Sequence, residues 1–554
     1  SQKIRLEINE YKSEFNFEGK SSKLVFLFNR AAFIFFIFVI ISLIFSIKIF
    51  YYGSMSNFKT NNSLILKNDF RADIIDRSGN ILAKTVLTKN VGINPNKVKD
   101  KKKFLLKLKL IFPEKNFGYI KKQLKNSKFF YLEKKISTEN LEKIKLLGEK
   151  AFIYETKISR IYPFPYLFSH TIGQIDEDNI GISGLEKSHN KNLTSEKLPL
   201  QLTLDTNIQF LIREELLKAN SVFQTVGSAA ILMDVNSGEI ISMVSTPDYD
   251  LNKRVKIDDD KFINRVTKGV YEFGSVFKTF TIAAGLNDEI IKPETKFLDL
   301  PKSIMCAGFP IREYDQNIPS TLTAEQILIR SGNIGSVKIA QAIGQEKFKL
   351  FLSNLGVLEK INFDIEEVGK PIKFNWGKCP LATASFGHGI TTTLLQLAKA
   401  YAIIANGGYK IEPTTIAKTR NINNKKKILS NDVSKKILPI LRKIVTTKEG
   451  TASLANVDGY EIGGKTGTAQ KSIAGNYTKK KINTFVSIFP TSKPKFVLAV
   501  MLDEPKTNKD YIYHYRDGSN IKYKGTPFNT AGWTTVEVTG QIIENIGPIL
   551  ATKY

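Results

Sequence analysis

A long apolar run near the N-terminus constrains the fold of this chain more than any other feature of its sequence. From Ala31 to Ile47 only two serines are polar, and after Lys48 the run continues through residues 49–52 to an aromatic edge. About 20 apolar residues form a helix of roughly 30 Å, which is the thickness of the hydrocarbon core of a bilayer. We therefore predict a single transmembrane helix over residues 31–52.

Two other interpretations of this run are a cleaved signal peptide and a buried core helix. The run is long for a signal peptide and has no small-x-small cleavage site before Gly53, and core helices are seldom so uniformly apolar. Lys20, Lys23 and Arg30 precede the run, which favours a cytoplasmic location for its N-terminal side. We therefore expect a short cytoplasmic tail over residues 1–30, a single membrane anchor, and the rest of the chain outside the cytoplasm.

The length and composition of the chain indicate more than one globular domain. A chain of 554 residues is too long for one ordinary core, and its hydrophobic fraction of 42% and charged fraction of 24% are those of globular proteins. The net charge of +28 comes mainly from lysine. Because no aromatic-basic stripe or nucleic-acid-binding module accompanies runs such as Lys101–Lys103, we expect a solvated basic surface and no nucleic-acid partner.

The cysteines and histidines do not indicate a metal centre. The chain has two cysteines, Cys306 and Cys379, no Cys-x-x-Cys, and four scattered histidines without metal-ligand spacing. We therefore expect no metal and no cofactor. His388 lies between two glycines, and we expect it to pack within a loop rather than to act in catalysis. A disulfide between the two cysteines is possible outside the cytoplasm, but the sequence leaves this question open.

The clearest chemical signal is the segment Gly274-Ser275-Val276-Phe277-Lys278, which opens an apolar run that ends at Leu286. The spacing of the apolar residues predicts a largely buried helix, on which Ser275 and Lys278 share a face. A serine hydroxyl becomes nucleophilic when a neighbouring base accepts its proton, and a lysine held against apolar surface loses pKa and can be that base. The pattern alone is weak, because Ser-x-x-Lys occurs four more times in this lysine-rich chain.

Two further motifs follow in order. Ser331-Gly332-Asn333 lies downstream, and the chain's single Lys-Thr-Gly comes after it, within Lys465–Thr468. The three motifs in this order, with flanking segments at residues 264–274, 385–390 and 450–452, resemble the penicillin-binding proteins and serine β-lactamases. The resemblance implies an α+β penicillin-binding/serine transpeptidase fold, in which an antiparallel sheet is flanked by helices.

The region between the anchor and residue 200 alternates short strand-like and helix-like pieces and shows no catalytic constellation. Residues 70–80 predict a strand that ends in a turn at Ser78-Gly79-Asn80, and residues 101–148 have helical spacing.

Three segments of this region resemble the non-catalytic pedestal (dimerisation-type) domain of class B penicillin-binding proteins, and Ala72 stands where glycine is usual. These segments are residues 70–80, 159–163 and 181–186. We therefore expect an α+β pedestal domain over residues 53–200 and a transpeptidase domain over residues 201–554.

The expected transpeptidase domain contains several predicted strands and a C-terminal helix. The predicted elements are a hairpin at residues 228–235 and 239–244, strands at residues 485–489 and 496–502, and a helix at residues 536–546. The resemblance places the segment that carries Lys465 in the same sheet, beside the helix that carries Ser275.

The resemblance also assigns roles in acyl transfer. Ser275 is the expected nucleophile, and Lys278, neutral when it is desolvated near a second cation, is the expected base. Ser331 is expected between Lys278 and Lys465 as a proton relay to the departing nitrogen. Lys465 is expected to supply positive potential.

Four further residues are expected to hold the substrate. Asn333 offers both a donor and an acceptor to the peptide backbone of the substrate. Thr466 and Thr468 are expected to hydrogen-bond a terminal carboxylate, and Gly467 is expected to leave room for substrate at the strand edge. The resemblance assigns the oxyanion hole to the backbone N–H groups of Ser275 and Thr468.

Three functions compete for this set of motifs. The first is a D,D-transpeptidase that transfers the acyl group of a D-alanyl-D-alanine stem peptide to the amine of another stem in peptidoglycan. The second is a β-lactamase, but the Glu-x-x-Leu-Asn of class A enzymes does not occur between Asn333 and Lys465. The third is a β-lactam receptor, which would need a cytoplasmic signalling domain, and the tail before Ala31 is too short for one. We expect the transpeptidase.

The segments around the motifs look most like those of the division-specific, septal (FtsI-type) enzymes, and the cell-elongation class B enzyme is the alternative. These segments are residues 331–335, 464–471, 501–505 and 531–533. Residues 534–537 depart from the Ala-Ala-Pro that usually follows. The resemblance implies peptidoglycan stem peptides, β-lactams, the membrane, a glycosyltransferase and other division proteins as partners. It also implies that the anchor lies in the inner (cytoplasmic) membrane and the catalytic domain in the periplasm.

Overall fold

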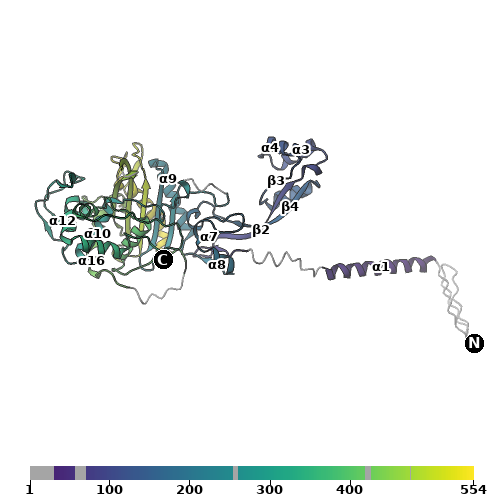
Figure 1. Cartoon of the computed structure of the whole chain (residues 1–554), viewed down its shortest axis with the longest axis horizontal. Coiled ribbons are helices and arrows are strands. Elements are labelled where there is room, and N and C mark those ends of the chain that lie inside the picture. The colour runs from purple at the N-terminus through teal and green to yellow at the C-terminus, as the bar shows by residue number, and fades with distance from the viewer. Residues whose placement is uncertain (1–29, 56–69, 197, 254–259, 418–425, 474–475) are drawn as a thin grey trace, which may run out of the picture. The chain divides into compact units, whose positions relative to one another are not determined.

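The structure is a computed structural model that describes residues 30–55, 70–196, 198–253, 260–417, 426–473 and 476–554 (Figure 1). The chain divides into two units, residues 1–69 and residues 70–554, and each is described by itself. The predicted cytoplasmic tail lies outside the described residues except for Arg30, where the first helix begins.

The predicted apolar helix is present as α1, Arg30–Met55, with 26 residues. A helix of this length extends about 39 Å, and no residue of its apolar stretch Phe33–Tyr51 is buried. Within the part of the chain that the structure describes, α1 is the one helix long and apolar enough to cross a bilayer. It therefore fits a single-pass membrane anchor.

The second unit begins with a five-stranded sheet. Four of its strands lie in the order β3 (Phe130–Glu133), β2 (Ile81–Ile93), β1 (Ile74–Ile75), β5 (Leu200–Gln201), and β4 (Phe152–Ile161) also pairs with β2.

Three helices pack on strands β2, β3 and β4 of this sheet and enclose a separate hydrophobic core. They are α3 (Lys101–Ile111), α4 (Phe117–Lys125) and α5 (Thr138–Leu146). The Asp100 carboxylate accepts hydrogen bonds from the Lys102 and Lys103 N–H groups at the start of α3, as expected for an N-cap.

The strand predicted over residues 70–80 is shorter than the sequence indicates. Only Ile74–Ile75 belongs to the ladder. The Asp76 carboxylate accepts hydrogen bonds from the Ser78 and Asn80 N–H groups and closes the turn directly after it. Before it, Ala72 donates its N–H to Leu193 rather than to a strand. The prediction was therefore right about the turn and wrong about the length of the strand.

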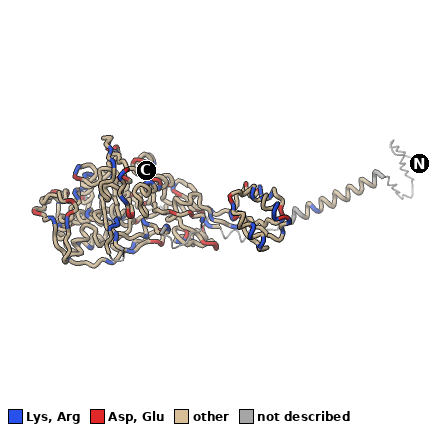
Figure 2. The backbone as a smooth tube through the Cα atoms, turned by 90° about the horizontal axis from the view of Figure 1, so that it is seen from above, with Lys and Arg blue, Asp and Glu red and all other residues tan. Residues whose placement is uncertain are grey.

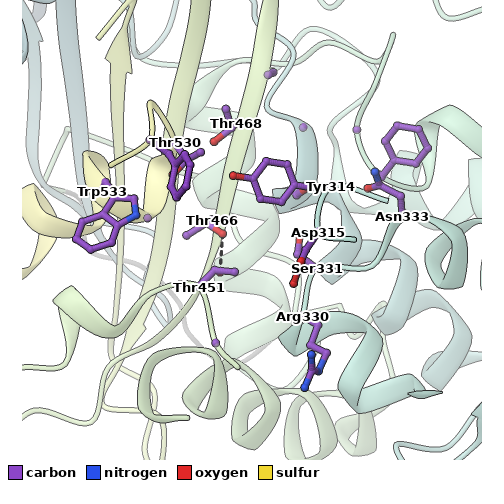
Figure 3. Close-up of a pocket in the computed structure, with 18 of the residues that line it drawn as sticks. Tyr314, Asp315, Arg330, Ser331, Asn333, Thr451, Thr466, Thr468, Thr530 and Trp533 are labelled. Carbon is purple, nitrogen blue, oxygen red and sulfur yellow. Dashed lines mark hydrogen bonds between the residues drawn. The ribbon is translucent and has the colours of Figure 1, made fainter. Parts of the chain in front are cut away.

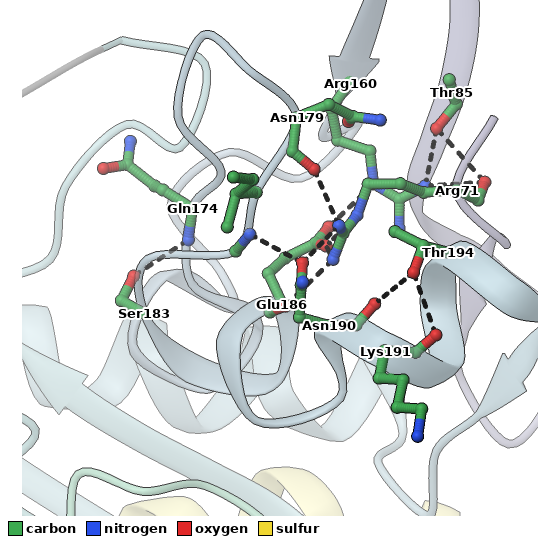
Figure 4. Close-up of polar contacts among 12 residues, drawn as sticks. Arg71, Thr85, Arg160, Gln174, Asn179, Ser183, Glu186, Asn190, Lys191 and Thr194 are labelled. Carbon is green, nitrogen blue, oxygen red and sulfur yellow. Dashed lines mark hydrogen bonds and ion pairs between the residues drawn. The ribbon is translucent and has the colours of Figure 1, made fainter. Parts of the chain in front are cut away.

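A buried cluster of charges joins three of the segments that the sequence singled out (Figure 4). The Glu186 carboxylate accepts hydrogen bonds from Arg71 Nε at 2.9 Å and from Arg160 Nε at 2.7 Å, and all three side chains are at most 1% exposed. Arg71 also donates to Asn190. Glu186 lies on α7 (Gly184–Ser188), so the cluster ties the ends of the sheet strands to this short helix.

The remainder of the second unit is built on an antiparallel five-stranded sheet. Its order is β12 (Gly463–Ile473), β13 (Asn476–Phe489), β14 (Phe496–Asp503), β6 (Gly227–Asp234), β7 (Ile240–Thr246). The structure confirms the predicted hairpin, which is β6 and β7, and the two later strands, which are β13 and β14.

Helices cover both faces of this sheet, and successive residues of a strand point to opposite layers. On one face, Ala230 and Leu232 of β6 share a core with α9 (Thr206–Phe223) and α17 (Thr535–Lys553). On the other face, Ala229 and Ile231 share a core with the larger layer of helices. The main helices of that layer are α10 (Lys278–Asn287), α12 (Asn333–Ile343), α13 (Gln345–Leu355), α15 (Leu394–Ala405) and α16 (Asn431–Thr446).

The remaining helices and strands are short. They are α6 (Ser169–Ile172), α8 (Asn190–Ser195), β8 (Lys296–Phe297), β9 (Ser303–Cys306), β10 (Phe309–Arg312), β11 (Leu322–Thr323), α11 (Ala324–Ile329), α14 (Lys378–Ala384), β15 (Ile512–His514) and β16 (Lys522–Lys524). Lysine and arginine residues are spread over the whole of the second unit (Figure 2).

A disulfide joins Cys306 and Cys379, which are 73 positions apart. Cys306 ends β9, and Cys379 lies on α14. The bond therefore ties the β9–β10 hairpin to α14, and both elements pack against α12. The structure decides a question that the sequence left open.

Replacing Glu186 by alanine is expected to lower the free energy of unfolding by about 3–5 kcal/mol, because Arg71 and Arg160 would stay buried without their counter-charge. Urea denaturation of the full chain in detergent micelles, followed by circular dichroism, measures the effect. Glu186→Gln keeps an acceptor oxygen but not the charge. Its free energy of unfolding should therefore lie between those of the wild type and of Glu186→Ala. An alanine variant as stable as the wild type would contradict the assigned role of the cluster.

Candidate active site

The segment around Ser275 forms a tight turn that leads into a buried helix. Residues Gly274–Phe277 make one turn of 3-10 helix, and α10 follows from Lys278. The turn packs closely on strand β12, because a Cβ on Gly467 would lie 2.1 Å from the Phe273 carbonyl oxygen. Because Gly467 has no side chain, the backbone of this turn can pack directly on β12. This close packing brings Ser275 next to the strand that carries Lys465.

Lys278 is buried beneath the second motif. Its side chain is 1% exposed, and its Nζ donates to the Ser331 carbonyl oxygen at 2.5 Å, to Asn333 Oδ1 at 2.7 Å and to Ser331 Oγ at 3.2 Å. Burial lowers the pKa of Lys278 to about 7, although the charge of Glu313 opposes part of this shift. A substantial fraction of Lys278 is therefore neutral near pH 7 and able to accept a proton.

Lys465 approaches the same serine from the sheet. Lys465 is fully buried, and its Nζ donates to Ser331 Oγ at 2.9 Å. Burial, followed by the nearby charge of Lys278, holds the pKa of Lys465 well below its ordinary value. The Ser331 hydroxyl lies between the two lysine nitrogens, so the structure brings together the three residues that the sequence placed in a proton relay.

Ser331 owes its position to an unusual backbone conformation. It has φ +58°, in the left-handed region, and it lies in the turn between α11 and α12. A non-glycine residue adopts this conformation at a cost of about 1–3 kcal/mol, and such conformations cluster at functional sites. The surrounding structure therefore holds the Ser331 hydroxyl toward the lysines against a local conformational preference.

Ser275 itself is half-buried and lines a cleft. Among the described residues its hydroxyl makes no hydrogen bond, so the predicted pairing of Ser275 with Lys278 on one face is not a hydrogen bond in this structure. In active sites without substrate, catalytic hydrogen bonds are commonly too long or poorly aligned. Lys278 meanwhile bonds to Ser331 and Asn333.

The predicted substrate-holding side chains lie along the same cleft (Figure 3). The Asn333 amide already uses both of its ends, since Oδ1 accepts from Lys278 and Nδ2 donates to the Arg312 carbonyl at 2.7 Å. Thr466 Oγ1 lies 2.7 Å from Thr451 Oγ1. Thr468 Oγ1 accepts from the Ala531 N–H at 2.9 Å. Hydroxyl groups that can rotate toward a substrate therefore line the strand edge.

Glu313 is a residue of this site that sequence reasoning missed. Its carboxylate is buried and accepts hydrogen bonds from the Asn333 and Ile334 N–H groups, at 2.6 and 2.9 Å, at the N-terminus of α12. It fixes the start of the helix that presents Asn333 to Lys278. No sequence motif indicates Glu313, because the two N–H groups that it binds lie 20 and 21 positions further along the chain.

The cleft has a volume of about 960 Å³. Segments from across the second unit line it together with β12: residues 272–275, 314–315, 330–333, 386–388, 448–454 and 528–533. A nucleophile, a neutral amine, a hydroxyl relay and a hydroxyl-lined strand edge are the parts that acyl transfer through a serine ester requires.

Comparisons with known proteins agree with this geometry. Residues 228–519 match the family described as "Penicillin binding protein transpeptidase domain", and residues 68–214 match the "Penicillin-binding Protein dimerisation domain". The chain belongs to this family of penicillin-binding proteins, which are serine-type acyl-transferring enzymes. The resemblance and the fold class predicted from the sequence are therefore confirmed.

Relatives span most of the chain. "Peptidoglycan D,D-transpeptidase FtsI" of Buchnera aphidicola is 31% identical over 85% of this chain and 88% of its own. "Probable peptidoglycan D,D-transpeptidase FtsI" of Caulobacter vibrioides is 29% identical over 87% of this chain and 82% of its own. A crystal structure of penicillin binding protein 3 from Mycobacterium tuberculosis, complexed with aztreonam, shares the fold with a TM-score of 0.66 and 21% identity, over 86% of this chain and 96% of that one.

The lowered pKa of Lys278 predicts the pH dependence of acylation. Below pH about 7 the rate of acylation by penicillin is expected to fall about tenfold per pH unit, because only neutral Lys278 accepts a proton, and above it the rate should level off. Labelled penicillin and rapid quenching between about pH 5.5 and 9 measure the profile. Circular dichroism at each pH controls for unfolding. A rate that still climbs at the alkaline limit would mean that Lys278 keeps an ordinary lysine pKa.

Proposed function

We propose that this protein is a division-specific (septal) peptidoglycan D,D-transpeptidase that forms an acyl-enzyme on Ser275. The observation that carries the proposal is the Ser331 hydroxyl held between two buried lysine nitrogens beside the Ser275 turn. The substrate is a stem peptide that ends in D-alanyl-D-alanine, and β-lactams are inhibitors that acylate the same serine. The family and the names of the FtsI relatives support this substrate class.

In the acylation step, Ser275 Oγ attacks the carbonyl carbon of the penultimate D-alanine while neutral Lys278 takes the hydroxyl proton. The backbone N–H groups of Ser275 and Thr468 stabilise the oxyanion. The C–N bond then breaks, and the departing amine of the terminal D-alanine receives a proton through Ser331, beside Lys465. The products are a D-alanyl ester on Ser275 and free D-alanine.

In the second step, the amine of another stem peptide attacks the ester. The same relay runs in reverse: Ser331 removes a proton from the attacking amine, and Lys278 returns one to Ser275 Oγ as the ester bond breaks. The product is a new amide cross-link. Asn333 holds the backbone of the donor in both steps, and Gly467 keeps the strand edge close to Ser275. Thr466 and Thr468 bind the terminal carboxylate of the donor until the first step releases D-alanine.

The septal assignment rests on the segments around the motifs and on the FtsI relatives. Other relatives carry different names, among them "Stage V sporulation protein D" of Bacillus subtilis, 29% identical over 79% of this chain. The cell-elongation class B enzyme is therefore the alternative. The distinction concerns where the enzyme works rather than the acyl transfer that it carries out.

We further propose that α1 anchors the protein in the inner membrane, with residues 53–200 as a pedestal and residues 201–554 as the catalytic domain in the periplasm. The apolar length of α1 and the basic residues before it support this topology. A periplasmic location also suits the disulfide between Cys306 and Cys379. A glycosyltransferase that supplies new strands, and other division proteins, are the expected partners.

Labelled penicillin is expected to acylate Ser275, and Ser275→Ala should abolish the labelling. The adduct should last from many minutes to hours, because a transpeptidase excludes water from its ester until an amine arrives. Mass spectrometry of the labelled peptide and single-turnover loss of label measure both points. Ser492→Ala, in another Ser-x-x-Lys of the chain, is the matched control and should label normally. An adduct elsewhere, or turnover near the median enzyme rate of about 10 per second, would overturn the assignment.

A fluorescent fusion of the full chain is expected to gather at the division site in growing cells. Depletion of the protein should then give filaments that elongate without dividing. Ser275→Ala in the fusion controls for localisation that depends on activity. A fusion spread along the side wall, with rounded cells on depletion, would instead support the elongation enzyme.

A further inference from the structure

The part of the second unit that connects β2 to β4 carries an unusual concentration of positive charge. Residues 94–151 hold 17 lysines, no arginine and six acidic residues, which gives a net charge of +11 over 58 positions. The net charge of the whole chain is +28, so more than a third of it lies in about a tenth of the sequence. We call this segment the basic head, and it contains α3, α4, β3 and α5 (Figure 1).

The acidic residues of the basic head are largely engaged within it. The Asp100 carboxylate caps the start of α3. Three of the glutamates form ion pairs with lysines of the same segment: Lys107–Glu149, Lys115–Glu133 and Lys143–Glu139. These acids therefore do little to neutralise the remaining lysines at the surface.

The outer face of α3 combines exposed leucines with exposed lysines. Leu106 and Leu110 are 66% and 86% exposed, and Lys102, Lys103 and Lys109 are exposed on the same side of the helix. At 3.6 residues per turn these five positions span an arc of about 120°, with the leucines in the middle and lysines on both sides. Among the described residues the three ammonium groups have no acidic partner. The opposite face of α3 is buried in the core of the head.

This arrangement of side chains suits a lipid surface better than a protein partner. Helices that lie on anionic membranes place leucines at the boundary of the acyl chains and lysines at the level of the headgroups. Protein interfaces are instead enriched in arginine and depleted in lysine, because the planar guanidinium forms bidentate pairs with carboxylates. Single exposed leucines are ordinary on protein surfaces. Here two of them lie one turn apart within a strongly basic segment that has no arginine.

The chain between α1 and the second unit is long enough for the head to reach the bilayer. Helix α1 ends at Met55 and the second unit begins at Phe70, so 14 residues connect them, which extend at most roughly 50 Å. Within the second unit, β2 runs from Ala83, which pairs with Ile74, to Ile93 at the head. This part of the strand rises roughly 33 Å. The connection is longer than that distance, so α1 and α3 can meet the same bilayer.

We propose that the outer face of α3 docks the basic head on the anionic phospholipid surface of the membrane that α1 spans. Leu106 and Leu110 enter the headgroup layer, and Lys102, Lys103 and Lys109 face the lipid phosphates. The protein then has two contacts with the membrane, which limit the height and tilt of the second unit above it. The proposal rests on the proposed anchorage by α1 and is independent of the chemistry of the cleft.

The test places one environment-sensitive label on α3 of the full chain in proteoliposomes. The two native cysteines form a disulfide, so Leu110→Cys supplies the one free thiol for a nitrobenzoxadiazole label. In vesicles that contain phosphatidylglycerol its emission should shift to the blue and be quenched by nitroxide-labelled lipids. In vesicles of phosphatidylcholine alone it should report water. Leu350→Cys on α13 is the matched control, because Leu350 is 62% exposed beside Lys349, and its label should report water in both.

Neutralising the lysines tests the electrostatic part of the proposal. The triple variant Lys102→Gln, Lys103→Gln, Lys109→Gln should lower the docking equilibrium constant, taken from the quenched fraction of label, about a hundredfold. The reason is that each lysine near an anionic surface contributes about fivefold. Raising the salt concentration should also release the label, because salt screens these charges. The matched control Lys347→Gln, Lys349→Gln on α13 should leave docking unchanged.

The outcomes separate the docking surface from the anchor. Vesicle flotation reports on α1: a chain that does not float would refute the anchor and the docking with it, whereas a floating chain whose α3 label stays in water would refute only the docking. Equal quenching with and without phosphatidylglycerol, or in the triple variant, would overturn the assignment to anionic lipid. A label that only an acidic protein shields would place a protein on this face instead. Penicillin labelling of every variant controls for folding.

Discussion

The burial of two lysine ammonium groups around one serine hydroxyl is the constraint on which the site depends. Lys278 and Lys465 are at most 1% exposed, and both donate to Ser331 Oγ. Removing an ammonium group from water favours its neutral form, and a second cation nearby adds to the effect. The pKa of Lys278 therefore falls to about 7, within reach of neutral pH. Desolvation thus gives Lys278 the neutral amine that its proposed role as proton acceptor requires.

The rest of the fold keeps these groups together against their local preferences. Lys278 comes from α10, Ser331 from a turn with φ +58°, and Lys465 from β12. Glu313 fixes the start of α12, and the Cys306–Cys379 disulfide ties together elements packed on that helix. Strain at Ser331 persists because the surrounding packing determines its position more strongly than its own backbone preference does.

Two of the buried charge clusters in the second unit illustrate opposite uses of burial. In the first, Arg71 and Arg160 share the Glu186 carboxylate, so opposite charges compensate one another and the cluster joins structural elements. In the second, Lys278 and Lys465 have no acid in direct contact among the described residues, and their pKa values fall. Uncompensated burial costs stability, and it is the condition that makes a lysine reactive.

Local sequence patterns determined much of this protein. The apolar run specified α1, two apolar runs joined by a short turn specified the β6–β7 hairpin, and the order of three short motifs indicated the family. These features depend on neighbours within a few positions, where periodicity and turn chemistry act. The strand predicted over residues 70–80 is shorter than expected because Asp76 closes a turn and Ala72 bonds to Leu193, a residue far along the chain.

Only the tertiary structure decided the contacts that place the chemistry. The disulfide spans 73 positions, Glu313 meets the N-terminus of α12, and Lys465 reaches Ser331 across 134 positions. The sequence determines the chemical type of each side chain. Its burial, and therefore its pKa and its partners, follows from the packing of segments that no local pattern connects.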